Sequence, residues 1–211
     1  MNKINCQLNS QNIVHWFSAI RNLPESKRNK ALDAFWDGQI DSKAWLINEL
    51  NSSMMNDSSE VNVYVFGSWL GVLSSMLFDC STFNINTIRG IDIDPECQEI
   101  SNTVCYPWVK NNQYLAVTDD MSKYEYDNVP HIVINTSSEH VEQSVYDEWY
   151  DRIPYNTLIV VQGNNFFECP EHQRCASSIV DFKRLNHVSN PIFSGHHDTS
   201  IYTRFMCMWR K

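Results

Sequence analysis

Two glycines and one acidic residue lie at a spacing that suits recognition of a nucleoside. Gly67-x-x-x-Gly71 follows the apolar run VNVYVF, and Asp92 comes 25 residues after Gly67. Glycines after a strand leave backbone amides open to a ligand. An acid about 20 residues further along suits a ribose, because carboxylate oxygens only accept hydrogen bonds. The residues predicted to line this part of a nucleoside site are Gly67, Ser68, Trp69, Gly71, Asp92 and Ile93.

A second pair of acids follows the third apolar run of this part of the chain. Asp119 and Asp120 come directly after YLAVT, and Met121 is the next residue. A carboxylate at this place can accept a hydrogen bond from the exocyclic amine of adenine, while the apolar Met121 side chain covers the ring. The alternative is a solvated loop, and we predict ligand contact.

The densest cluster of polar and titratable groups is NTSSEH, residues 135–140, which follows the fourth apolar run. A histidine with a pKa near neutrality suits a general base for an oxygen nucleophile. Glu139 and His140 are therefore the predicted catalytic residues. The alternative is that they only open the next helix, where an acid complements the helix dipole.

A third group, Cys169, His172 and Cys175, has the soft ligands that zinc prefers at intervals of three residues. Structural zinc sites usually show two spaced ligand pairs, and the downstream His196 and His197 have no spacer between them. We interpret the segment as a polar loop with incidental thiols and predict no metal site. Zinc binding stays open as the alternative.

The elements that must position these residues fall into two regions. Residues 1–60 are predicted to form an N-terminal helical lid, in which one apolar helix face has the expected spacing: Ile13, Trp16, Phe17 and Ile20. Gly38 is expected to end a second helix, and Asp41 to cap a third.

Residues 61–211 are predicted to form the ligand-binding domain. Apolar strands alternate there with helical stretches, which predicts a parallel sheet covered on both faces. The last two strands are joined only by the short stretch HHDTS. Such a short connection fits an antiparallel pair, since a parallel pair needs a crossover of a dozen or more residues.

Composition narrows the class of protein. The chain has 211 residues and a formal net charge of −9, which argues against broad binding to nucleic acid, because that binding depends on cationic contacts. No apolar run is long enough to cross a bilayer, and the first residues lack the apolar core of a secretory signal. We expect a cytoplasmic protein whose seven cysteines are reduced thiols.

The order of these elements, together with Gly67, Gly71, Asp92 and Asp120, resembles the class I methyltransferases that use S-adenosylmethionine (SAM). The resemblance begins at residue 61 and implies a Rossmann-like, doubly wound α/β fold with a seven-stranded mixed sheet whose last strand is antiparallel. It implies SAM as the cofactor, with the glycines near its methionine part, Asp92 on the ribose and Asp120 (or Asp119) at the adenine. The chain is similar as well to small methyltransferase-like proteins of tailed bacteriophages, which would place it in a host cytoplasm.

The resemblance implies methyl transfer to a small-molecule or nucleotide-sized acceptor, since NTSS lacks the Asn/Asp-Pro-Pro-aromatic motif of amino-group DNA methyltransferases. Val65 stands where the family usually has an acid that helps to hold the SAM ammonium group, and Trp69 stands at its middle glycine. Asn135 is the predicted substitute for the acid. These departures keep two alternatives open, a non-catalytic SAM- or nucleoside-binding protein and a SAM-cleaving enzyme. A nicotinamide-dependent oxidoreductase is disfavoured, because the glycines do not form G-x-G-x-x-G. The oligomeric state is not predicted.

Overall fold

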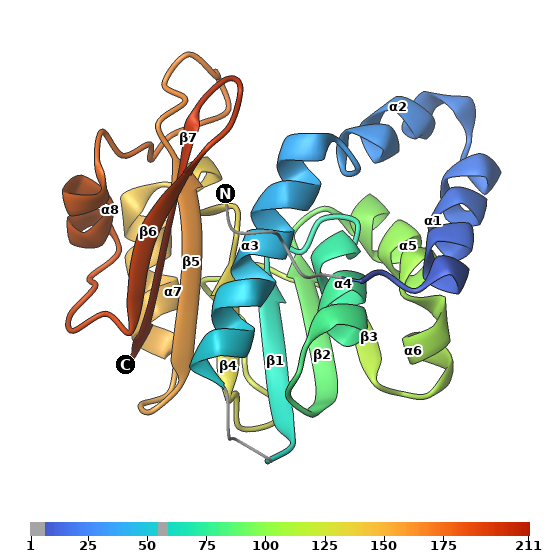
Figure 1. Ribbon diagram of the computed structural model, residues 1–211, viewed down its shortest axis with the longest axis horizontal. Coiled ribbons are helices and arrows are strands. Elements are labelled where there is room, and N and C mark those ends of the chain that lie inside the picture. Colours follow the sequence, from blue (N-terminus) through green and yellow to red (C-terminus); the bar gives the residue numbers. More distant parts are fainter. Residues whose placement is uncertain (1–6, 55–58) are drawn as a thin grey trace.

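The computed structural model describes residues 7–54 and 59–211. Within these residues, seven strands form one sheet in the order β3-β2-β1-β4-β5-β7-β6 (Figure 1). β1 to β5 run parallel, while β7 is antiparallel to both β5 and β6. The predicted doubly wound α/β fold with an antiparallel last strand is confirmed. The strands are β1 (Val61–Phe66), β2 (Ile85–Asp92), β3 (Tyr114–Thr118), β4 (Ile132–Asn135), β5 (Leu158–Asn164), β6 (Phe193–Asp198) and β7 (Thr203–Arg210).

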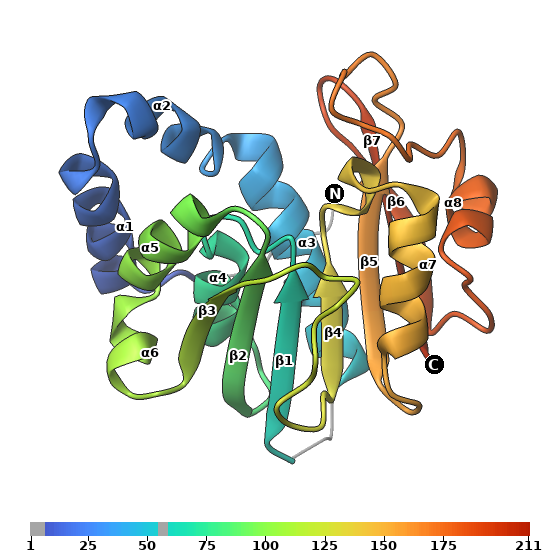
Figure 2. The ribbon, with the colours of Figure 1, turned by 180° about the vertical axis from the view of Figure 1, so that it is seen from behind.

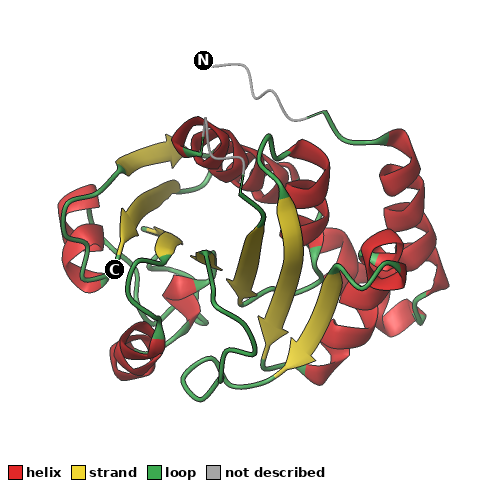
Figure 3. Cartoon of the chain, turned by 90° about the horizontal axis from the view of Figure 1, so that it is seen from below, coloured by secondary structure: helices red, strands yellow, loops and turns green. Residues whose placement is uncertain are grey.

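Helices cover both faces of this sheet. α3 and α4 lie in front of it in Figure 1, and α7 lies in front of it in the view from behind (Figure 2). Figure 3, seen from below, shows the twist of the sheet between the helical layers. The helices are α1 (Ser10–Asn22), α2 (Glu25–Asp33), α3 (Asp37–Ser53), α4 (Val72–Cys80), α5 (Pro95–Val104), α6 (Tyr106–Lys110), the 3-10 turn η1 (Ser138–His140), α7 (Gln143–Arg152) and α8 (Ile179–Leu185).

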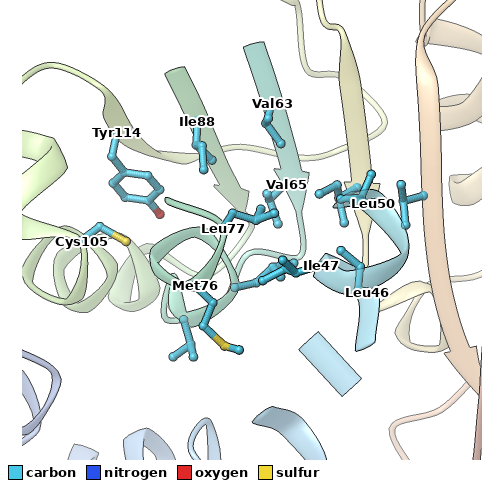
Figure 4. Close-up of a cluster of buried hydrophobic side chains, with 14 of the residues drawn as sticks. Leu46, Ile47, Leu50, Val63, Val65, Met76, Leu77, Ile88, Cys105 and Tyr114 are labelled. Carbon is cyan, nitrogen blue, oxygen red and sulfur yellow. The ribbon is translucent and has the colours of Figure 1, made fainter. Parts of the chain in front are cut away.

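Successive residues of the strands pack into different cores. Val63 and Val65 of β1 join the core beneath α1 to α5, while Tyr64 and Phe66 join the core beneath α7 and α8. Figure 4 shows part of the first core, where Leu50 of α3 lies near the strand residues. Neighbouring side chains of a strand point to opposite faces, so the continuous apolar run VYVF, residues 63–66, is typical of a strand that is buried on both sides.

The expected boundaries of the second and third helices are wrong. α2 ends at Asp33 and α3 begins at Asp37, so Gly38 and Asp41 both lie inside α3. The Gly38 amide donates to the Asp37 carboxylate over 2.7 Å. A Cβ on Gly38 would come within 2.6 Å of the Trp36 ring. The glycine is therefore explained by the close approach of this ring and not by a helix stop.

The N-terminal helices are attached to the sheet domain by buried hydrogen bonds. Trp16 of α1 donates its indole N–H to Ser75 Oγ of α4 over 2.9 Å. Gln162 of β5 donates its side-chain amide to the carbonyl of Ser42 in α3 over 3.0 Å. The division into a lid of residues 1–60 and a second domain stays a prediction, and parts of that lid (1–6 and 55–58) lie outside the described residues.

One crossover contains no helix. Residues 119–131 connect β3 to β4 as turns and extended chain. Aromatic rings of this segment pack edge-on against β1, with Tyr126 at 5.0 Å from Tyr64 and Tyr124 at 5.6 Å from Phe66 between ring centroids. These aromatic contacts cover the sheet where the regular alternation of strand and helix is interrupted.

Cys80 departs from the expectation of reduced thiols, because it is disulfide-bonded. The spacing of cysteines along a chain does not show which of them meet in space, and the sequence gives no signal for this bond. Cys6 lies outside the described residues. Among the described cysteines, those without a disulfide are Cys97, Cys105, Cys169, Cys175 and Cys207. Among the described helices, none combines the length and the apolar character needed to cross a membrane.

Candidate functional site

The carboxyl ends of β1, β2, β3 and β4 open onto one cavity of about 830 Å³. The chain runs from β1 outward through β2 and β3 and then returns to β4 on the other side of β1. Doubly wound sheets bind ligands at such a reversal of strand order, and this volume is within the range of small-molecule sites. The predicted residues that line the cavity are Gly67, Ser68, Trp69, Asp92, Ile93, Asp119, Asp120, Met121, Asn135, Glu139 and His140.

Every second residue of the turn after β1 has a left-handed backbone conformation, with φ of 60° at Gly67, 48° at Trp69 and 75° at Gly71. A Cβ on Gly67 would lie 2.8 Å from the Cβ of Ser137, so only glycine fits where the ends of β1 and β4 meet. A left-handed conformation costs a residue with a side chain about 1–3 kcal/mol. At Trp69 this strain is offset by Asp92, whose Oδ2 accepts the Trp69 amide over 2.7 Å.

Gly71, a predicted cofactor contact, is absent from the cavity wall. A Cβ there would press on the side chain of Ser101 and would lie 3.1 Å from Cys105 Sγ and 3.2 Å from the Tyr114 hydroxyl. These groups belong to α5, to the residue that follows α5 and to β3, and Cys105 and Tyr114 are part of the core. Close packing and the left-handed backbone explain this glycine, and the geometry gives no support for ligand contact.

Asp92 connects the turn to the cavity. Its Oδ2 accepts the amide of Trp69, and its Oδ1 accepts the amide of Asp94 over 3.1 Å. Each carboxylate oxygen has two acceptor positions, so Asp92 retains capacity for the hydroxyls of a ligand. The same side chain thus fixes the turn and presents acceptors at the end of β2.

The two acids after β3 differ in their availability. Asp120 is engaged within its own turn: its Oδ1 accepts the amide and hydroxyl of Ser122, and its Oδ2 pairs with Lys123 at 2.9 Å. The hydrogen bond from Lys123 lowers the pKa of Asp120. Asp119 uses Oδ1 for one amide N–H at 2.8 Å, and its own amide donates to the Asp92 carbonyl over 3.0 Å. Asp119 is therefore the better placed of the two to bind a ligand.

Four further predicted cofactor contacts have different surroundings within the cavity wall. Ile93 is 73% exposed and Met121 is half-buried, so both offer apolar surface to a ligand. Ser68 and Asn135 are buried. Asn135 uses its Oδ1 to accept the amide of Ser137 over 3.0 Å, which shapes the turn after β4.

Glu139 lies in a buried ion pair at the wall of the cavity. Its Oε1 accepts from the Asn164 side-chain amide over 2.7 Å and pairs with Arg204 at 2.6 Å. Arg204 also donates to the Thr136 carbonyl, so the guanidinium joins β7 to the turn after β4. Within the described residues, Oε2 of Glu139 is buried without a hydrogen-bond partner. An unsatisfied buried carboxylate oxygen calls for an explanation such as a bound ligand or ion.

His140 and His172 meet edge to face, with their ring centroids 4.7 Å apart. Part of the His140 ring is open, yet removal of the rest from water lowers its pKa below the ordinary value; Glu139 opposes this shift, while His172 adds to it. His172 Nδ1 lies 2.9 Å from the carbonyl oxygen of Phe166. A carbonyl only accepts, so Nδ1 carries the proton. The neutral tautomer then leaves Nε2 of His172 with its lone pair.

The N-terminal helices contribute a buried cation. Lys43 of α3 lines the cavity and donates to Gln39 Oε1 over 2.7 Å. Burial lowers the pKa of Lys43 to about 7; the nearby Arg204 adds to this effect and Glu139 opposes it. An anionic ligand in the cavity would favour the charged form.

Sequence reasoning missed Lys43, Asn164 and Arg204, and His172 was considered only as a zinc ligand. Asn164 ends β5 and lies at the same edge as the predicted residues. Arg204 is near the start of β7, which runs antiparallel and so begins where its neighbours end. Ligands bind at the carboxyl ends of parallel strands, and Asn164 lies at such an end. The first residues of an antiparallel strand lie at the same edge of the sheet, and a search that includes them also finds Arg204. Nothing in the local sequence distinguishes Lys43 from a solvent-exposed lysine.

No family model and no curated protein matches this chain. Solved structures match its fold. The magnesium protoporphyrin IX methyltransferase ChlM from Synechocystis PCC 6803, with bound S-adenosylhomocysteine (SAH), is 12% identical with a TM-score of 0.63, and the match covers 96% of this chain and 95% of ChlM.

Two other structures with bound SAH show the same architecture. The N-methyltransferase NodS from Bradyrhizobium japonicum WM9 is 12% identical with a TM-score of 0.63, over 93% of this chain and 98% of NodS. TrmK from M. capricolum is 9% identical with a TM-score of 0.54, over 77% of this chain and 67% of TrmK. The chain therefore has the fold of the class I SAM-dependent methyltransferases.

Proposed function

We propose that the protein is a SAM-dependent methyltransferase that acts on a small-molecule or nucleotide-sized acceptor. One observation carries the proposal: four consecutive parallel strands deliver Gly67, Asp92, Asp119 and Glu139 to a single cavity at the reversal of strand order. The bound SAH in ChlM and NodS, which share this fold, supports the choice of cofactor.

The cofactor half of the cavity fits SAM in its donor set. Asp92 has acceptor capacity for a ribose, and Asp119 lies on the adjacent strand end with a carboxylate available for an adenine amine. Ile93 and Met121 add apolar surface for a ring, and Gly67 begins the turn near the methionine part. When bound, SAM supplies a methyl group on a positively charged sulfur, which is electrophilic.

The acceptor half is assigned to the turn after β4. Glu139 and His140 line the cavity together with the cations Lys43 and Arg204. Because its pKa is lowered, the His140 imidazole is uncharged at neutral pH and has a lone pair to offer. Alignment of the acceptor with the methyl group supplies much of the catalysis in such a displacement, and the rigid ion pair of Glu139 with Arg204 provides fixed contacts for it.

A non-catalytic SAM-binding protein is the second candidate, and Trp69 is the observation that favours it. The indole stands at the middle of the turn and lines the cavity, where the family usually has glycine. Val65, at the position of the usual acid, is fully buried. Both features alter the methionine end, where transfer takes place, and leave Asp92 in place.

Titration calorimetry with SAH tests the cofactor assignment. Asp92→Ala removes a charged partner of the ribose and should weaken SAH binding by about 1–3 kcal/mol, which corresponds to roughly tenfold to hundredfold. Asp92→Asn keeps one oxygen to accept an amide N–H and should show a smaller loss. Asp151→Asn, an exposed acid on α7, is the matched control and should bind as the wild type does.

Absence of SAH binding by the wild type would refute the proposal. If both Asp92 variants bound SAH with the affinity of the wild type, the ribose assignment would be refuted. Incubation with radiolabelled SAM and fractionated small molecules then separates the two candidates. Transfer of label to a small molecule supports the methyltransferase. Tight binding without transfer supports the second candidate, and release of methylthioadenosine would instead indicate cleavage of SAM.

A further inference from the structure

Three side chains that can bind a metal ion converge in the cavity. One carboxylate oxygen of Glu139 and one ring nitrogen each of His140 and His172 lie within 4.8 Å of one another, and all three residues line the cavity. Ligands about 2.1 Å from one ion are at most about 4.2 Å apart, so side-chain shifts of well under 1 Å would complete the group. We propose that Glu139, His140 and His172 bind a divalent transition-metal ion.

The carboxylate is held with one oxygen available. Asn164 and Arg204 both bind Oε1 of Glu139, which fixes the orientation of the side chain. Oε2 is buried and, among the described residues, has no partner. The ion pair with Arg204 would weaken the attraction for a cation. The other two ligands are imidazoles, which bind a metal in their neutral form and so add no positive charge. A metal ion would satisfy the carboxylate oxygen that the protein leaves unpaired.

The hydrogen bond of His172 leaves one of its ring nitrogens for a metal. The Phe166 carbonyl accepts from Nδ1 of His172, which leaves Nε2 to act as the ligand. Metal-binding histidines usually have their second nitrogen hydrogen-bonded to a carbonyl or carboxylate, because this bond fixes the tautomer and the ring orientation.

The donor set indicates the class of ion. Two imidazoles and one carboxylate suit borderline ions such as Zn²⁺, Co²⁺ and Mn²⁺, whereas Mg²⁺ and Ca²⁺ prefer oxygen ligands. Three protein ligands leave coordination positions open, as in catalytic and not in structural zinc sites. An oxygen atom of the methyl acceptor is the group we assign to an open position. This role of the metal rests on the proposed function, whereas the binding of metal does not. A metal ion at this site makes His140 a metal ligand instead of a base.

The zinc alternative drawn from the sequence shares only His172 with this site. Cys175 Sγ lies 3.6 Å from His172 Nδ1, the nitrogen that already carries a proton. Burial raises the pKa of the Cys175 thiol to about 11, so it is protonated at neutral pH. Metals bind the thiolate, and the cysteine is therefore a poor ligand compared with the carboxylate of Glu139.

Cobalt titration of the full chain, stripped of metal with EDTA, tests the site without reference to activity. We expect about one Co²⁺ per chain with the visible absorption of a bound ion, and Zn²⁺ should displace it. His172→Ala and His140→Ala should each lower the affinity at least tenfold. His196→Ala removes an exposed histidine of β6 outside the cavity and should bind Co²⁺ as the wild type does.

Failure to bind Co²⁺, or unchanged affinity in both ligand variants, would overturn the proposal. Glu139→Gln also breaks the buried ion pair with Arg204 and so affects folding as well as binding. The variants of the two partly exposed histidines therefore decide the outcome, with circular dichroism as the check on folding. Titration of the metal-free protein with SAH reports separately on the cofactor site. Metal binding without SAH binding would refute the methyltransferase and retain the metal site, and the converse would refute only the metal site.

Discussion

Replacement of Lys43 by methionine should stabilise the protein near neutral pH. Lys43 is 7% exposed, and burial lowers its pKa from 10.5 to about 7. One pKa unit corresponds to about 1.4 kcal/mol, so a charged Lys43 destabilises the fold by an amount on the order of 5 kcal/mol. Methionine has a similar length and no charge. Allowing for the donor that Gln39 loses, we expect Lys43→Met to gain a few kcal/mol at about pH 6.

The gain should shrink as the pH rises. Between about 7 and 10.5, the native state has lost the Lys43 proton while the unfolded chain retains it. The unfolded state then binds more protons, and the free energy of unfolding of the wild type rises by up to about 1.4 kcal/mol per pH unit. The variant has no proton to lose at this position, so the two stabilities converge toward the upper end of this window.

Urea unfolding followed by circular dichroism at about pH 6, 7.5 and 9, with EDTA present, measures this difference. Buried tyrosines and cysteines also titrate at high pH, but they are present in both proteins and cancel in the comparison. Lys110→Met, at an exposed lysine of α6, is the matched control and should change stability by no more than about 0.5 kcal/mol at each pH. A difference between Lys43→Met and the wild type that is constant with pH, or a less stable variant at about pH 6, would refute the reasoning.

Two further substitutions test the framework of the site. Gly71→Ala forces a side chain into a left-handed position packed against Ser101 and should lower stability by about 1–3 kcal/mol or more, while the folded fraction keeps its affinity for SAH; a loss of affinity in that fraction would show that the turn position touches the ligand. Arg204→Leu leaves the buried charge of Glu139 without its partner and should cost about 3–5 kcal/mol in urea unfolding; a loss below about 1 kcal/mol would mean that the pair contributes little to folding.

Much of the sheet could be predicted because its strands are buried on both faces. A run such as VNVYVF carries its signal locally, and the short connection before β7 restricts the last pair to an antiparallel arrangement. The connection from β3 to β4 carries no such signal. Tyr124 and Tyr126 acquire their role only from rings on β1, which are distant in the sequence. The prediction that Gly38 ends a helix was wrong for a similar reason, because this glycine is explained by the nearby Trp36 ring and not by a turn.

The site was predictable as far as strand ends define it. Asp92, Asp119 and Glu139 were selected by position alone, and all three line the cavity. The sequence could not distinguish Asp119 from Asp120, because the pairing of Asp120 with Lys123 depends on how the turn folds. The position of Lys43 in the cavity wall could not be predicted, because it lies on a helix whose approach to the cavity depends on tertiary packing.

The attachment of the N-terminal helices determines how a ligand can reach the cavity. Buried hydrogen bonds hold α1 to α4 and α3 to β5, so neither helix can swing away without breaking them. Between α2 and α3, the centroid of the Trp36 ring lies 6.4 Å from that of the Tyr202 ring, and both residues line the cavity. Separation of these two rings would widen the cavity there without breaking either of those hydrogen bonds. Entry of a ligand at this place would then need the loss of one aromatic contact and not the release of a helix.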